Sequence, residues 1–285
     1  MFRAASVTAL LALIALPACD RAEGEGQQDW QTVNSSRRAA GEQVLRVDVE
    51  YGAGSLSLAP GASGVLYQAN LRYDANVFRP VVEYADSRLR VGVNGSTGNT
   101  GRTRNVRAGE LDLRLGTDVP VEIDLKFGAA EANIDLGGIP VRRLQVQTGA
   151  SKTLLSVSRP NPERCQHAEF QLGAARFEAT GLGNLNVEHF SVQGGVGEMI
   201  LDFTGAWSAN MSAKVDMGLG SLTLRMPRGL GVRVGRTGVL TSFDSQGLVK
   251  RGDSYYSETW ETAARRLSLD LNTALGSVRV VWIDS

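Results

Sequence analysis

Two acidic residues and two histidines are the side chains of this sequence whose types and spacing could support catalysis or metal binding. Glu198 and Asp202 are four positions apart, and a pair of carboxylates is what glycoside hydrolysis requires. His167 and His189 are the only histidines, and Cys165 next to His167 is a weak metal signal, because the usual zinc sites need more His or paired Cys. No Gly-x-Ser-x-Gly motif, Walker loop or dinucleotide fingerprint stands where a strand leads into a helix. The residues therefore predict no catalytic site, no metal site and no cofactor.

A basic loop is the first of two segments that could contact a partner. Residues 94–107 are rich in Gly and Thr and carry Arg102, Arg104 and Arg107 without an acidic residue. Such a loop could meet anionic lipid or a wall polymer. A solvated loop without any partner has the same composition, and both interpretations stay open.

The second segment that could contact a partner is rich in aromatic residues. Residues 241–262 contain Tyr255, Tyr256 and Trp260. If these rings were exposed together they would form a binding patch. The sequence favours a different role, in which they cover an open end of a β structure, because uncovered strand edges invite aggregation.

Composition bounds the class of protein. The 285 residues include 30 basic and 30 acidic side chains, so the formal net charge is zero. A nucleic-acid-binding protein should carry a clustered positive excess, and this balance argues against that class. Hydrophobic residues make up 42%, which is enough for a substantial core. Two cysteines cannot form a disulfide scaffold.

The N-terminus is typical of an exported protein. Residues 4–16 form an uncharged and mostly apolar run, too short to span a bilayer and suited to a signal peptide over residues 1–18. The run ends in Leu16-Pro17-Ala18-Cys19, which resembles the lipobox of bacterial lipoproteins. That resemblance implies cleavage before Cys19 and lipid on this residue; ordinary secretion is the alternative. The polar stretch over residues 19–43 is expected to be a flexible tether.

Alternating patterns dominate from residue 44 onward. Val47, Val49 and Tyr51 alternate with Asp48 and Glu50, and similar alternation recurs along the chain. A period of two indicates strands with one buried face. We therefore expect an all-β protein.

A repeat organises these strands. Seven segments begin with a small residue, any residue and a second small residue, followed by alternating apolar positions; the second small residues are Gly54, Ala130, Ser151, Ala175, Gly197, Gly220 and Gly276. The intervals near 22 residues predict a single-chain β-solenoid in which these small residues stack. A two-sheet β-sandwich is the alternative, because short strands with regular turns also fit it.

The repeat also predicts which side chains are buried. The inward positions are Leu56 and Leu58, Ala132 and Ile134, Thr153 and Leu155, Phe177 and Ala179, Met199 and Leu201, Leu222 and Leu224, and Val278 and Val280. In the outward columns charges alternate or cancel, as in paired side chains on a solvated face. This pattern weakens the case for a catalytic role of Glu198 and Asp202.

The segment from Val47 to Leu58, with its Gly52-Ala53-Gly54 centre, and the strand patterns up to residue 93 resemble the N-terminal part of bacterial toast-rack domains. The glycine-rich repeats that follow resemble their solenoid body. The resemblance divides the mature chain into a toast-rack-like β region over 44–115 and a repetitive β-solenoid over 116–285. It implies a non-enzymatic envelope protein related to putative adhesins and to cell-wall-antibiotic response proteins, and it supplies no catalytic residues.

The expected function follows from the anchor and the repeat. We expect a lipid-anchored, non-catalytic protein of the cell envelope that serves binding, scaffolding or stress sensing. A surface adhesin-like module is the alternative, and a polysaccharide-active enzyme is a weaker third reading. The expected partners are a membrane, through the N-terminal lipid, and an envelope protein or wall polymer, but not nucleic acid. The sequence does not decide between the periplasmic side and the cell surface.

Overall fold

The computed structural model describes residues 28–95 and 109–284, and β-strands make up most of them. The elements are β1 (Trp30–Arg38), β2 (Leu45–Pro60), β3 (Val65–Asp74), β4 (Phe78–Ala85), β5 (Arg88–Gly95), β6 (Gly109–Leu115), β7 (Val121–Asp135), β8 (Val141–Ser156), β9 (Cys165–Thr180), the 3-10 helix η1 (Leu182–Leu185), β10 (Val187–Asp202), β11 (Met211–Pro227), β12 (Gly231–Asp244), β13 (Leu248–Arg251), β14 (Ser254–Ser257) and β15 (Arg266–Ile283). All strands belong to one sheet. None of the helices in these ranges is long and apolar enough to cross a bilayer.

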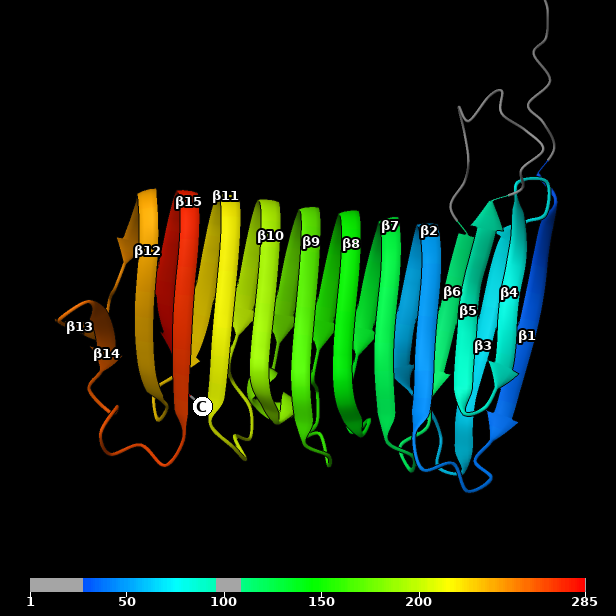
Figure 1. Ribbon diagram of the computed structural model, residues 1–285, viewed down its shortest axis with the longest axis horizontal. Helices are drawn as coiled ribbons and strands as arrows, with labels where there is room; N and C mark the ends of the chain where they lie inside the picture. The colour runs from blue at the N-terminus through cyan, green and yellow to red at the C-terminus, as the bar shows by residue number, and fades with distance from the viewer. Residues whose placement is uncertain (1–27, 96–108, 285) are drawn as a thin grey trace, which may run out of the picture.

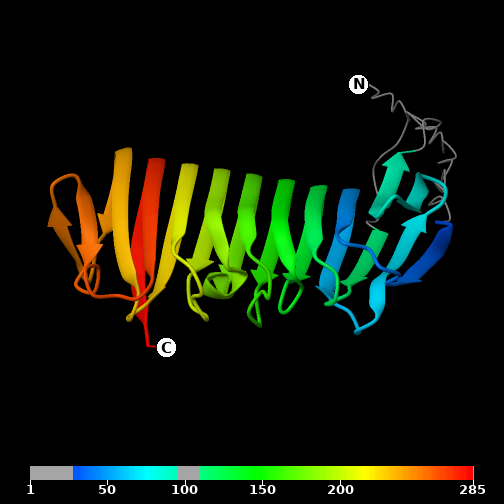
Figure 2. The same ribbon diagram turned by 60° about the horizontal axis from the view of Figure 1, so that its bottom comes forward.

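Eight long strands form the body of the molecule, and we call each of them a rung. They are β2, β7, β8, β9, β10, β11, β15 and β12, in spatial order, and each has 14 to 18 residues. Every rung folds over at its middle, so that its two arms face each other (Figure 1). The bends lie along one edge of the molecule and the connecting loops along the opposite edge (Figure 2).

Neighbouring rungs pair in parallel and in the register that the repeat predicted. Gly54 pairs with Ala130, Ser151 with Ala175, Ala175 with Gly197, Gly197 with Gly220 and Gly220 with Gly276, while the pair Glu131–Lys152 places Ala130 beside Ser151. The small residues therefore stack, and the β-solenoid is confirmed. The β-sandwich alternative is wrong, because the rungs form one continuous sheet rather than two separate ones.

The space between the two arms holds the hydrophobic core. All fourteen inward side chains predicted from the repeat are buried, none more than 3% exposed. Four phenylalanine rings form a chain of contacts in the core, with ring centroids 5.2 to 6.2 Å apart, in the order Phe177, Phe170, Phe190 and Phe203. Burial of these aligned apolar columns is the main stabilising contribution, since no single rung could bury its inner face alone.

Tight bends explain the glycines of the repeat. Gly220 has φ of 143°, and a Cβ atom there would lie 1.8 Å from the carbonyl oxygen of Gly197 on the next rung. Ala130 and Ala175 occupy the same column without a positive φ. The bends of β10, β11 and β15 therefore need glycine, whereas those of β7 and β9 accept alanine.

The N-terminal region is continuous with the solenoid. β5 pairs with the first arm of β2 and β6 with its second arm, as the pairs Asp48–Arg90 and Ser57–Asp112 show. Together they replace one rung: Gly92 pairs with Glu50 and Gly109 with Gly54. A boundary between residues 115 and 116 therefore does not divide the fold, because β2 pairs with β6 on one side and β7 on the other.

The expected tether over residues 19–43 is wrong in part. Trp30–Arg38 forms β1, an edge strand that pairs antiparallel with β3. Its side chains are mostly polar because only one edge and part of one face contact the protein, and backbone hydrogen bonding to β3 does not require apolar alternation. Trp30 lies beneath the Arg72 guanidinium, 4.6 Å from ring to charge. Residues 1–27, including the expected signal peptide and Cys19, lie outside the described residues.

The C-terminal end has an order that the sequence did not reveal. β15 lies between β11 and β12. After β11 the chain therefore first forms β12, one position further out, and later returns as β15 to fill the position between them. β12 is an eighth rung, in which Thr241 takes the place of the second small residue opposite Gly276. The short strands β14 and β13 follow at the outer side of β12.

Candidate functional site

A long groove follows the bends across all eight rungs. Its volume is about 1230 Å³, and at the usual strand spacing eight rungs span about 34 Å. Each rung contributes up to three consecutive residues, so three columns line the groove. The first column is Glu50, Lys126, Gln147, Gln171, Gln193, Asp216, Asn272 and Thr237; the second is Tyr51, Phe127, Thr148, Leu172, Gly194, Met217, Thr273 and Gly238; the third is Gly52, Gly128, Gly149, Gly173, Gly195, Gly218 and Ala274. We call this feature the bend groove.

The first column is polar and almost neutral. Three glutamines occupy its centre, and its charged members are Glu50, Lys126 and Asp216. Lys126 is paired with Asp124 at 3.2 Å. Burial disfavours ionisation of Asp216, but hydrogen bonds from Asn272 and Lys214 outweigh that effect and hold the pKa of this carboxyl below its usual range. The groove therefore offers amide donors and acceptors in a row without a strong field of either sign.

The second column is apolar for most of its length and contains two unusual hydroxyls. Tyr51 Oη and Thr148 Oγ1 are buried and have no hydrogen-bond partner among the described residues. Burial, with a smaller contribution from the Glu110 carboxylate, raises the pKa of Tyr51. The third column must be nearly free of side chains, because a Cβ on Gly173 would lie 2.7 Å from the carbonyl oxygen of Gly149.

An exposed apolar row adjoins the third column of the groove. At the next position of each rung, Val196, Leu219, Leu275 and Leu240 pair in register on β10, β11, β15 and β12. Their exposed fractions are 53, 47, 44 and 70%. The corresponding residues of β2, β7, β8 and β9 are alanines, so the large side chains occur in one half only. We call these four residues the bend ridge.

The comparison with protein families decides which family has this architecture. The family model for the N-terminal domain of toast_rack matches residues 22–179 and, in a second segment, 167–225. The chain belongs to the toast-rack family. The resemblance inferred from the sequence is thereby confirmed, although the match does not bear on lipidation.

Solved structures related to this toast-rack protein are distant. A candidate cell adhesion protein from Clostridium sporogenes is 15% identical with a TM-score of 0.46, and the alignment covers 90% of this chain and 100% of that one. A candidate adhesin from Bacteroides fragilis is 12% identical with a TM-score of 0.37, covering 88% and 97%. A candidate lipid-binding protein from Parabacteroides distasonis is 10% identical with a TM-score of 0.38, covering 90% and 98%. No protein of curated function matches the chain.

The two carboxylates of the acidic pair have separate structural partners in this toast-rack protein. Glu198 is exposed and pairs with Arg176 at 3.5 Å. Asp202 is buried; one of its oxygens accepts the Thr204 amide at 2.8 Å, and the other lies 3.9 Å from Arg225. Arg176 belongs to β9 and Arg225 to β11, so the two carboxylates are held toward opposite neighbours of β10.

The histidines and the free cysteine have no metal-binding geometry. The rings of His167 and His189 stack on neighbouring rungs, 5.2 Å apart and 19° from parallel. Cys165 is fully buried, and its thiol donates to the His167 carbonyl at 3.4 Å. Within residues 28–95 and 109–284, no three His, Cys, Asp or Glu side chains come together as a metal site.

The basic loop can be placed only by its flanks. Arg102, Arg104 and Arg107 lie outside the described residues. Gly95 ends β5 and Gly109 begins β6, and Gly109 pairs with Gly54 at the bend of β2. The two flanks of this loop therefore lie at the edge that carries the groove and ridge, and the role of its arginines as a partner surface stays a prediction.

The three aromatic residues of the C-terminal segment, Tyr255, Tyr256 and Trp260, are half-buried, and each packs against another aromatic ring. Tyr255 packs edge-on against Phe243 of β12 at 4.9 Å, and Tyr256 packs against Trp260 at 5.6 Å. β14, which carries both tyrosines, pairs with the edge of β12. This arrangement covers part of the last rung, while binding of a partner by these rings stays a prediction.

Sequence reasoning missed the groove and the ridge. The ridge is formed by the middle position of the small-x-small segments, to which the sequence analysis gave no role. The groove is formed by the first small residue and the two residues before it. Reading that middle column would have given Ala53, Ala129, Ala150 and Ala174, followed by Val196, Leu219 and Leu275. A change from Ala to larger aliphatic residues at an exposed position was the available signal.

Proposed function

We propose that this protein is a non-catalytic binding and scaffolding module of the bacterial cell envelope, held to a membrane by lipid on Cys19. The bend groove is its binding site for an extended ligand. The observation that carries this proposal is the continuity of the groove, whose lining repeats in register over eight rungs. A lining that repeats from rung to rung suits a periodic, elongated ligand better than a small molecule.

The chemistry of the groove favours a neutral glycan, such as a wall polymer. Its glutamines supply paired donors and acceptors, and its charges nearly cancel, which disfavours a polyanion. An added peptide strand would need free backbone groups, but the rungs beside the groove are already paired on both sides from β7 to β15. Side-chain amides and short apolar surfaces remain for recognition.

A non-catalytic role agrees with the pairing of the acidic side chains. Glu198 and Asp202 each interact with an arginine, and the solvated column around them alternates in sign. No pair of carboxylates within the described residues lines the bend groove at a spacing suited to hydrolysis, because Glu50 and Asp216 are five rungs apart.

The anchor is tested by fractionation. Cys19→Ser should move the protein from the membrane fraction to the soluble fraction, because lipid attachment is lost. Unchanged fractionation of Cys19→Ser would count against the lipid anchor. Protease treatment of intact cells then separates the two locations: a protected domain fits the periplasmic side, and a cleaved domain fits a surface adhesin.

Ligand binding is tested by co-sedimentation with purified, insoluble cell-wall glycan. The double variant Gln147→Ala, Gln193→Ala should reduce the sedimented fraction about tenfold, since it removes two amides from the groove. Gln68→Ala is the matched control, because Gln68 is an exposed amide on β3, away from the groove. Equal sedimentation of all three proteins would show that the groove does not bind this glycan.

A further inference from the structure

The bend ridge is an unusual surface for a solvated edge. Val196, Leu219, Leu275 and Leu240 are contiguous because strand pairing places them side by side. Isolated exposed aliphatic residues are common, but a contiguous row usually marks a surface that contacts something. No other described residue covers the ridge, since all four members are at least 44% exposed.

The described chain begins at the same edge. Trp30 pairs with Asp74, Arg72 pairs with Glu110, and Glu110 pairs with Ser55, one residue after Gly54 in the bend of β2. Successive pairing therefore brings the start of β1 to the level of the bends. Figure 1 shows the same relation: β1 starts at the upper edge, where the rungs bend, and runs toward the loop edge.

The length of chain before β1 limits how far this edge can be from the membrane. Gln28 follows Cys19 by nine positions, and a fully extended chain over nine positions spans about 30 Å. A lipid on Cys19 would thus keep the β1 end of the bend edge within about 30 Å of the bilayer. The ridge lies on the same edge at the far end, on β10 to β12.

We propose that the bend ridge rests on the membrane surface, so that the toast-rack lies lengthwise along the bilayer with its loop edge facing away. This inference rests on the proposed lipid anchor. Four aliphatic side chains alone would bind a bilayer weakly, but the tether raises their effective concentration at the surface. The ridge therefore orients the protein, while the lipid holds it. The bend groove then opens beside the membrane surface.

The orientation can be measured with two fluorescent labels on the lipidated, full-length protein in vesicles of phosphatidylethanolamine and phosphatidylglycerol. One label is placed through Ser277→Cys, two residues after Leu275, and the other through Ala206→Cys in the loop between β10 and β11. Both positions are exposed, and Cys165 is buried and should not react. Spin-labelled lipid headgroups should quench the label at 277 at least threefold more than the label at 206. Equal quenching would overturn the proposal.

Ridge variants identify the cause of the orientation. Leu219→Ser with Leu275→Ser should abolish the difference in quenching, whereas Val249→Ser with Val281→Ser should preserve it. Val249 and Val281 are matched controls, at 48 and 37% exposure, that lie outside the ridge. The proposal is wrong if the ridge variant keeps the difference. It is also wrong if wild-type protein is a dimer that the ridge variant dissociates, because a second copy then occupies the ridge.

Mass spectrometry of the purified protein separates this proposal from the proposed function. A lipidated protein whose bend label is not quenched refutes only the orientation. A protein without lipid on Cys19 refutes the anchor and with it the present inference, while leaving glycan binding by the groove to its own test.

Discussion

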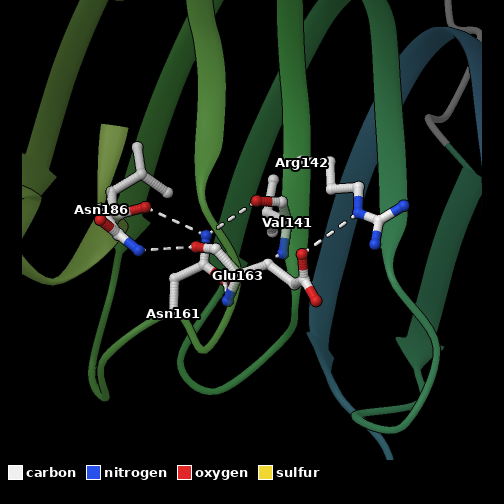
Figure 3. A network of polar contacts seen from close by, with 6 residues as sticks. Val141, Arg142, Asn161, Glu163 and Asn186 are labelled. Carbon is white, nitrogen blue, oxygen red and sulfur yellow. Dashed lines mark hydrogen bonds and ion pairs between the residues drawn. The ribbon is translucent and has the colours of Figure 1, made fainter. Parts of the chain in front are cut away.

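The Asn161 side chain forms two hydrogen bonds with the backbone of Val141, as a neighbouring strand would. Its Oδ1 accepts the Val141 amide at 3.1 Å, and its Nδ2 donates to the Val141 carbonyl at 2.8 Å (Figure 3). The same amide donates to Leu185 at 3.0 Å and accepts from Glu163 at 2.9 Å. Asn161 thus connects the start of β8 to the next two loops. Asn186 repeats this role one loop further along, where it donates to the Glu163 carbonyl.

Replacing Asn161 with alanine should lower the free energy of unfolding by about 2–4 kcal/mol. The side chain is 5% exposed, so its loss leaves several backbone groups without partners in a buried place. Asn133→Ala is the control, because Asn133 is an exposed asparagine on β7 and should change stability by less than about 0.5 kcal/mol. Urea unfolding measures both. Similar values for the two variants would contradict the buried-clamp role of Asn161.

Replacing Gly220 with alanine should cost about 3–4 kcal/mol. The φ of 143° is unfavourable for alanine, and the new Cβ would overlap the Gly197 carbonyl oxygen, 1.8 Å away. Gly229→Ala is the matched control, since Gly229 has open space around its Cβ position and no positive φ. Unfolding in urea should separate the two by several kcal/mol. A mild effect of Gly220→Ala would mean that the bend can shift to an ordinary conformation.

The sequence contained the register of the solenoid because small residues and inward apolar residues recur together. Phe177 and Leu222 could be assigned to the core since each follows a small-x-small centre at the same offset. β12 was not predicted as a rung, because Thr241 replaces the small residue of the repeat. Its position outside β15 depends on a long-range strand pairing that no local pattern encodes. β1 was not predicted as a strand, because an edge strand depends on backbone pairing more than on apolar alternation.

The candidate site was less accessible to sequence reasoning than the fold. Bend glycines were recognisable as corners, but the groove exists only because residues such as Gln147, Gln171 and Gln193 fall in one column on three rungs. The exposure of Leu219 and Leu275 likewise depends on the direction of the bend. Apolar residues in a repetitive sequence are ordinarily assigned to the core, and only the geometry of the bend places these outside.

The two acidic residues should respond differently to substitution, and neither should affect hydrolysis. Asp202→Ala should cost about 1–2 kcal/mol, because it removes the acceptor of the Thr204 amide and the partner of Arg225. Glu198→Ala should cost less than about 0.5 kcal/mol, since the side chain is 47% exposed and its ion pair is solvated. Thermal or urea unfolding gives these values, and reducing-sugar release from cell-wall polysaccharides gives activity. Hydrolysis by the wild type that either substitution abolishes would refute a non-catalytic role.

Cys165 should make stability depend on pH in the alkaline range. Burial raises the pKa of its thiol to about 12 in the folded protein, against about 8.5 in an unfolded chain. A raised pKa gives a contribution that is complete below about pH 8.5 and is lost as pH rises toward 12, because the unfolded chain releases its proton first. Between pH 8 and 10 the wild type should therefore lose about 2 kcal/mol more than Cys165→Ala, when each protein's unfolding free energy is compared with its own value at pH 8. Parallel pH profiles would show that the thiol is not held in its neutral form by the fold.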